Sequence, residues 1–162
     1  MFLRRLLLIL VAASAAPVGA AAQQESLGVF GTWGAFREPG RCYAIAAPEG
    51  AGRSGGAAFA AVSWWPRRGI RGQLHFRLER RKRPGSAVLL RVDERTFQLI
   101  GGGADAWAPD ARSDADIVTA MRTGLAMAIE TRAEGGGLLR SVYPLRGAAS
   151  AVDAAAIGCV GR

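Results

Sequence analysis

Short apolar runs, separated by glycine, proline and charged turns, occupy most of the chain after residue 28. In residues 73–80, Leu74, Phe76 and Leu78 alternate with polar residues, a period that is typical of a strand with one buried face. Asp93-Glu94 predicts a tight hairpin, and the glycines at 101–103 are expected to break the sheet. We expect about eight strands, at 29–36, 42–47, 57–65, 73–80, 87–92, 95–100, 126–132 and 138–146.

One segment, residues 113–124, has the features of a helix packed on a sheet. Ile117 and Met121 form an apolar stripe. Ser113 or Asp114 can serve as the N-cap, and Gly124 stands where a glycine commonly follows a helix. The segment therefore predicts a helix of about three turns that buries one face.

A second, shorter helix is expected near the C-terminus, at residues 151–157, capped by Ser150 and ended by Gly158. Many short strands with few helices are typical of antiparallel architectures. The predicted fold is therefore mainly β: an antiparallel β-sandwich or open barrel of about eight short strands, with one packed helix at 113–124 and a short C-terminal helix at 151–157.

Residues 1–22 have the composition of a secretory signal peptide. Arg4-Arg5 precedes the apolar stretch 6–16, and small residues at 20–22 form a cleavage site. The apolar stretch has 11 residues, whereas a helix that crosses a bilayer needs ~20. We expect cleavage near Ala22 and export of a single β-rich domain, residues 23–162, to the periplasm or the extracellular space, with no transmembrane span in the mature chain.

Cys42 and Cys159 are the only two cysteines. In an exported chain they have only each other as intramolecular partners, which predicts a disulfide. Counted from Cys42 to Cys159, the closed loop has 118 residues, and loop entropy assigns such a bond roughly 4–5 kcal/mol. Two free buried thiols are the alternative. A metal site is not expected, because these cysteines and His75 have neither the number nor the spacing of zinc ligands.

Positive charge is concentrated in residues 67–83, which hold eight arginines or lysines and one glutamate. The chain after residue 22 has a net charge of +6, so its other residues together are near −1. We expect this segment to attract anionic lipid, lipopolysaccharide or an envelope or host protein, and not nucleic acid. A solvated turn whose arginines discourage edge pairing is the alternative. The candidate contacts are the aromatic Trp64 and Trp65 and the basic Arg67, Arg68, Arg71, Arg80, Arg81, Lys82 and Arg83.

No set of residues indicates catalysis, and we expect neither a catalytic residue nor a cofactor. Residues 52–56 match G-x-S-x-G, but that motif needs a strand before it and a helix after it. His75 lies on the polar face of a predicted strand and is expected to be exposed or bonded to a partner, and not to act as a base. The aspartates surround a turn and a helix N-terminus, where acids stabilise the helix: Asp105, Asp110, Asp114 and Asp116.

Several short motifs follow one another along the chain in an order that resembles the invasion-associated locus B family of bacterial exported proteins, in a shorter form rich in alanine and arginine. The resemblance covers nearly all of residues 30–160 and implies a β-rich exported protein without a known catalytic set. Its motifs are Trp33, Cys42-Tyr43-Ala44, Phe97-Gln98-Leu99, Asp105-Ala106-Trp107, Ala120-Met121-x-x-Gly124, Tyr143-x-Leu145-x-Gly147-Ala148 and Cys159.

Three functions remain compatible with the sequence. The first, which we favour, is a binding module without enzymatic activity that uses residues 64–83. The second is a structural or stress-related periplasmic protein without a small-molecule ligand. The third is a small hydrolase, for which the sequence offers no matching nucleophile and base.

Overall fold

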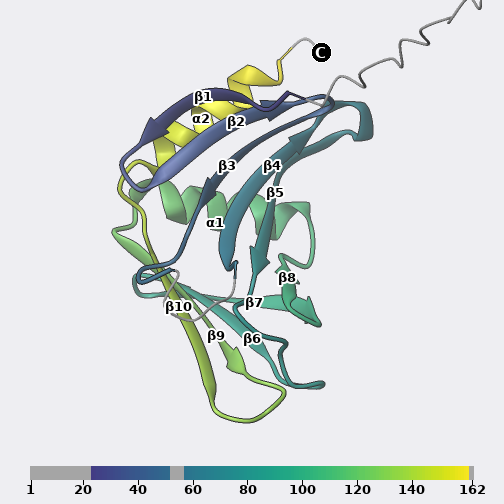
Figure 1. The fold of residues 1–162 in the computed structure, drawn as a ribbon, viewed down its shortest axis with the longest axis vertical. Coiled ribbons are helices and arrows are strands. Elements are labelled where there is room, and N and C mark those ends of the chain that lie inside the picture. Colours follow the sequence, from purple (N-terminus) through teal and green to yellow (C-terminus); the bar gives the residue numbers. More distant parts are fainter. Residues whose placement is uncertain (1–22, 52–56, 161–162) are drawn as a thin grey trace, which may run out of the picture.

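The computed structural model describes residues 23–51 and 57–160, and it shows a mainly β fold with two α-helices (Figure 1). The predicted signal peptide and the G-x-S-x-G segment lie outside the described residues. Within the described residues, ten antiparallel strands form one open sheet in the order β1-β2-β3-β4-β5-β8-β7-β6-β9-β10. They are β1 (Glu25–Phe30), β2 (Trp33–Glu38), β3 (Arg41–Ala46), β4 (Phe59–Trp65), β5 (Ile70–Arg77), β6 (Val88–Val92), β7 (Arg95–Gly102), β8 (Asp105–Trp107), β9 (Ala126–Arg132) and β10 (Leu138–Pro144).

The sheet curls so that its two halves meet in the core. Phe76 of β5 and Tyr143 of β10 stand in different halves of the strand order, yet their ring centroids are 5.8 Å apart. Trp33 is fully buried, and its indole Nε1 donates to the carbonyl oxygen of Pro144 at 2.9 Å. The predicted mainly β fold is confirmed, and its halves are parts of a single open sheet.

The alternating segment in β5 behaves as predicted. Leu74 and Phe76 are fully buried and Leu78 nearly so, while Arg77 between them is exposed. Both helices pack on this buried face: α1 (Ala111–Thr123) against β5, and α2 (Ala148–Gly158) against β1 to β4 (Figure 1). The period of two therefore identified the face on which the core forms.

Three parts of the sheet differ from the strand prediction. The strand predicted at 73–80 is β5, which begins at Ile70 and ends at Arg77. The run 29–36 is split between β1 and β2, because Gly31 and Thr32 turn the chain and Gly31 has a φ of 60°. The glycines at 101–103 do not break the sheet: β7 continues through Gly102, and the turn that starts at Gly103 leads into β8. Glycine is compatible with both strand and turn, so composition alone does not place the turn.

Helix α1 begins two residues before its predicted start and has a different cap. The N-cap is Asp110, whose Oδ1 accepts a hydrogen bond from the backbone N–H of Ser113 at 2.7 Å. This hydrogen bond holds the pKa of Asp110 below its usual value. Ser113 and Asp114, the predicted caps, lie inside the helix, because the chain enters the helix directly after Pro109-Asp110.

The predicted apolar stripe of α1 is confirmed, since Ile117 and Met121 are buried. Gly124 follows the helix in an extended conformation, with φ −75° and ψ 160°, so it is not a left-handed cap. A β-carbon at Gly124 would lie 2.9 Å from Cγ1 of Val92 and 3.0 Å from Cδ1 of Leu145. Glycine therefore avoids close contacts at this position, while its backbone angles are ones that other residues also adopt.

Asp114 ties α1 to β5 and makes a testable contribution to stability. Its Oδ1 accepts a hydrogen bond from the backbone N–H of Leu74 at 2.8 Å. Burial raises the pKa of Asp114 above its usual value, with a smaller contribution from Asp110, while the Leu74 N–H acts in the opposite direction. A raised pKa in the folded state means that stability is lost as the pH rises through that pKa.

We expect Asp114→Ala to lower the free energy of unfolding by about 1–3 kcal/mol, because the N–H of Leu74 would be buried without an acceptor. Asp114→Asn keeps an acceptor oxygen and removes the buried charge, so it should be at least as stable as the wild type at neutral pH. Urea unfolding at pH 4 and pH 7 measures both variants. An Asn variant that loses as much as the Ala variant at pH 7 would contradict this account.

Helix α2 begins three residues before its predicted start. Gly147, not Ser150, is the N-cap, with a φ of 91°. At the other end of the helix Cys159 forms a disulfide with Cys42 of β3, with a Cα–Cα distance of 5.8 Å. The predicted disulfide is confirmed, and it joins the last helix to the third strand of the sheet.

Candidate functional site

The basic segment 67–83 is divided into two groups by β5. Arg67 and Arg68 lie in the 3-10 turn η1 (Pro66–Arg68), and Arg71 lies at the start of β5. Arg77 is the last residue of this eight-residue strand, and the remaining basic residues follow it: Arg80, Arg81, Lys82 and Arg83. At about 3.3 Å per residue, the ends of β5 are roughly 20–25 Å apart. The single predicted patch is therefore two groups, at opposite ends of the β4–β5 hairpin (Figure 1).

The second group lies in the loop between β5 and β6. Lys82 is only 7% exposed, and its Nζ donates to the carbonyl oxygen of Arg83 at 3.1 Å, so it does not belong to an exposed patch. Arg81 forms an ion pair with Glu134 in the β9–β10 turn at 3.1 Å. Arg80 and Arg83 are exposed. These residues favour the alternative interpretation, a solvated loop, which here is linked to the β9–β10 turn by the Arg81–Glu134 ion pair.

The first group is held in place by local backbone geometry. Pro66 stands at the start of η1, and Gly69 ends it with a φ of 67° and an N–H that donates to the carbonyl oxygen of Pro66 at 3.1 Å. Proline at the start and a left-handed glycine at the end are favourable in such a turn. Arg67 and Arg68 are therefore presented at the tip of a closed turn.

The two tryptophans lie on opposite faces of β4, since successive side chains of a strand alternate. Trp64 pairs with Cys42 in the β3–β4 ladder and lines a groove beside α2. The ring of Trp65 lies 5.1 Å from the guanidinium carbon of Arg41 and 5.5 Å from that of Arg68, within the range of cation–π attraction. Both tryptophans are half-buried, so part of each side chain is open to solvent.

The arginines of the first group have no carboxylate partner in the described part of the chain. Arg67, Arg68 and Arg71 are exposed, and none of them takes part in an ion pair there. We call Trp64, Trp65, Arg67, Arg68 and Arg71 the hairpin-end surface. Its positive charge is not neutralised locally, unlike that of Arg81.

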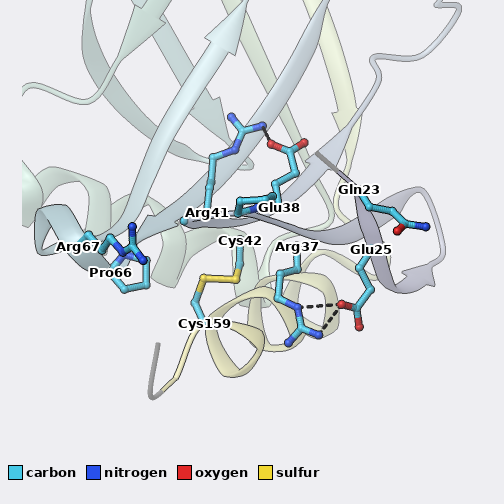
Figure 2. A pocket seen from close by; sticks show the side chains of 11 residues that line it. Gln23, Glu25, Arg37, Glu38, Arg41, Cys42, Pro66, Arg67 and Cys159 are labelled. Carbon is cyan, nitrogen blue, oxygen red and sulfur yellow. Dashed lines mark hydrogen bonds and ion pairs between the residues drawn. A yellow bond between two sulfur atoms is a disulfide. The ribbon is translucent and has the colours of Figure 1, made fainter. Parts of the chain in front are cut away.

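A pocket of about 510 Å³ lies next to this surface, at the disulfide (Figure 2). Figure 2 shows Arg37 with Glu25 on the same side of the strand as the disulfide, and Arg41 with Glu38 on the other side of that strand. Both acids among the described lining residues are thus paired with arginines. Arg67, which lies across the disulfide from Arg37 and Glu25 in Figure 2, is the third arginine among those residues.

Tyr43 adds a hydrogen bond to the Arg41–Glu38 ion pair beside the pocket. Its hydroxyl donates to Oε1 of Glu38 at 2.8 Å. Burial and the Glu38 carboxylate raise the pKa of the Tyr43 phenol, so this hydroxyl keeps its proton at neutral pH and remains a donor. The acceptor capacity of Glu38 is therefore used within the protein and not offered to a ligand.

A second concavity, an open groove of about 670 Å³, lies between the β4–β5 hairpin and the C-terminal end of α2. Trp64, Ile70 and Ile157 supply apolar walls, and Arg71 is the only charged residue that lines it in the part of the chain that the structure describes. Ile157 is 72% exposed and Val160 is 74% exposed. The hairpin-end surface is therefore continuous with an apolar groove.

His75 is hydrogen-bonded to a partner side chain, one of the two environments that we expect from the sequence. Its Nε2 lies 2.8 Å from Oδ1 of Asp105, and Oδ2 of the same carboxylate accepts from Nη1 of Arg77 at 2.9 Å. The ring of Trp107 is stacked beside the imidazole, with 5.3 Å between centroids and 6° between planes. Sequence inspection missed this cluster, because only the pairing of β5 with β8 brings Asp105 and Trp107 beside His75.

Tyr143 is a core residue whose polar hydroxyl group is not hydrogen-bonded within the described chain. It is fully buried, and its hydroxyl has no hydrogen-bond partner among the described residues. Burial, with a smaller effect of the Glu79 carboxylate, raises the pKa of this phenol. The hydroxyl is therefore neutral, and no pocket that we describe reaches it.

No family model, curated protein or solved structure matches this chain. Membership of the invasion-associated locus B family therefore stays a prediction from the motifs. Within residues 23–51 and 57–160, no cluster of three or more His, Cys, Asp or Glu side chains could hold a metal ion. Over the same residues, neither helix has the length and apolar character needed to span a bilayer.

Proposed function

We propose that this protein is an exported binding module without enzymatic activity, of the invasion-associated locus B type, whose hairpin-end surface binds anionic components of the bacterial envelope. The observation that carries the proposal is the set of three exposed arginines without carboxylate partners in the described chain, next to two half-buried tryptophans. The second basic group is not part of the proposed site, because Lys82 is buried and Arg81 is paired.

Electrostatics support this use of the surface. Exposed like charges repel one another, so a cluster without counter-charges attracts anions from solution. One guanidinium group can donate two hydrogen bonds to two oxygens of the same phosphate or carboxylate. Tryptophan side chains are favourable at the boundary between water and lipid. Near an anionic membrane each basic residue contributes about 1 kcal/mol. Three arginines would therefore strengthen binding about a hundredfold.

Export is part of the proposal and rests on residues 1–22 and on the disulfide. Arg4-Arg5, the apolar stretch and the small residues before Gln23 are in the order of a cleaved signal. The Cys42–Cys159 bond is of the kind that persists in oxidising compartments.

The test compares two triple variants with the same change in charge. In the first, Arg67, Arg68 and Arg71 are changed to serine; in the matched control, Arg80, Arg81 and Arg83 are changed. Co-sedimentation with phosphatidylglycerol vesicles or with lipopolysaccharide, at low and at physiological salt, measures binding. We expect the first variant to bind about a hundredfold more weakly than the wild type at low salt, with a smaller effect of the control.

Salt should weaken wild-type binding, because charges are screened over ~8 Å at physiological ionic strength. Equal binding by the two triple variants would show that the hairpin-end surface has no special role. Binding that does not depend on salt would contradict an electrostatic interaction.

A further inference from the structure

We infer that the groove beside α2 binds the alkyl chain of a single anionic lipid, with the acidic head group at Arg71; the inference rests on the proposed function of the hairpin-end surface. The groove lies between two elements that are far apart in the sequence, the β4–β5 hairpin and the end of α2. Cys159 lines the groove, and its disulfide to Cys42 holds α2 against the sheet. The disulfide therefore fixes the position of the α2 side of the groove relative to the sheet.

The size and lining of the groove suit an alkyl chain. Its volume is about 670 Å³, within the range of small-molecule sites, which are mostly apolar with few polar groups. Trp64 and Ile70 line one wall, and Ala156, Ile157 and Val160 line the other. Ile157 and Val160 are largely exposed, so a chain lying between these walls would remove apolar surface from water.

Charge indicates which end of the ligand is acidic. Among the described residues, Arg71 lines the groove and no acidic residue does. The neighbouring concavity on the other side of Arg71, of about 650 Å³, carries Asp110 and Asp114, which would repel an anion. The carbonyl end of α2 has partial negative charge and also disfavours an anion. An anionic head group therefore fits at the β5 wall, with the chain extending along the end of α2.

Dodecyl phosphate below its critical micelle concentration is a suitable probe, with binding measured by isothermal titration calorimetry. Inorganic phosphate lacks the chain, and dodecyl maltoside lacks the charge. We expect dodecyl phosphate to bind at least tenfold more tightly than either. Octyl and decyl phosphate should bind progressively more weakly, by roughly twofold to fourfold per methylene removed. Equal affinity for dodecyl phosphate and dodecyl maltoside would overturn the role of Arg71.

Three variants locate the site. Ala156→Trp fills the groove and should abolish binding of dodecyl phosphate. Ile157→Asp places a charge in the groove at a position that is 72% exposed, so it is expected to fold and to weaken binding at least tenfold. The matched control is Leu125→Asp, at a residue that is 83% exposed and does not line the groove. Circular dichroism and thermal melting confirm that each variant is folded.

The outcomes separate this inference from the proposed function. If Ala156→Trp and Ile157→Asp, once shown to be folded, bind dodecyl phosphate like the wild type, the groove is not the site. Ala156→Trp leaves Arg67, Arg68 and Arg71 in place. This variant should therefore still bind anionic vesicles in a salt-sensitive manner, as the wild type does. Failure of the wild type to bind vesicles, with dodecyl phosphate still bound in the groove, would overturn only the proposed surface.

Discussion

Changing both Cys42 and Cys159 to alanine is expected to lower the free energy of unfolding by about 2–5 kcal/mol. The two residues are separated by 117 positions, and a bond across a long loop restricts the unfolded chain strongly. In the folded state the bond also joins α2 to β3. Cys42 is 1% exposed, so alanine is the better replacement because a serine hydroxyl would be buried there.

Chemical unfolding with and without a reducing agent measures this effect. The reductant should destabilise the wild type and leave the double alanine variant unchanged, which serves as the control. Thiol titration of the unfolded, unreduced wild type should detect no free sulfhydryl. A wild type with two free thiols, or a reductant effect of the same size in the variant, would show that the bond does not form in solution.

Gly147→Ala is expected to lower the free energy of unfolding by about 2–5 kcal/mol, because two penalties combine there. Gly147 has a φ of 91° at the N-cap of α2, where a residue with a β-carbon is strained by about 1–2 kcal/mol. A β-carbon would also lie 1.8 Å from the carbonyl oxygen of Phe30. That atom belongs to the backbone at the end of β1, so the helix or the strand must shift.

Gly136→Ala is the matched control for this prediction. Gly136 has nearly the same backbone angle, a φ of 88°, but a β-carbon there would meet no atom within 4 Å. We expect the control to lose about 1–2 kcal/mol from the backbone angle alone. Thermal and urea unfolding of the two variants measures the difference. Equal losses at the two positions would mean that the contact with Phe30 contributes nothing.

The elements with a clear repeating pattern were predicted well. The alternation in β5 identified Leu74 and Phe76 as buried, since a strand with one covered face must follow a period of two. The apolar stripe in residues 113–124 identified Ile117 and Met121 as buried residues of α1, since a helix packed on a sheet buries one face. Short-range patterns sufficed in both cases because the requirement is local.

The caps and turns were predicted less well, for a physical reason. Ser113 and Asp114 are both suitable N-cap residues, but the cap is Asp110. Asp114 instead accepts a hydrogen bond from β5, a contact between residues 40 positions apart. Gly124 stands where a left-handed cap is common, but its backbone is extended and it lies in close contact with Val92 and Leu145. Each residue type permits several roles, and distant neighbours select among them.

The proposed site uses part of the predicted basic patch, and the structure divides that patch in two. Arg67, Arg68 and Arg71 were all in the predicted patch, and they are exposed beside the two tryptophans. Lys82 belongs to the same basic run but is buried. The contribution of α2 to the groove, through Ile157 and Val160, left no signal near residues 64–83 in the sequence.

By itself the sequence determined the mainly β class, the buried face of β5 and the pairing of the two cysteines, because each follows from local period or from the number of possible partners. The tertiary structure decided how surface residues combine. One extended strand separates basic residues that are neighbours in the chain. Folding of the sheet and the disulfide bring the end of α2 beside the β4–β5 hairpin. Proximity in space depends on strand order and helix docking, which single-residue properties do not encode.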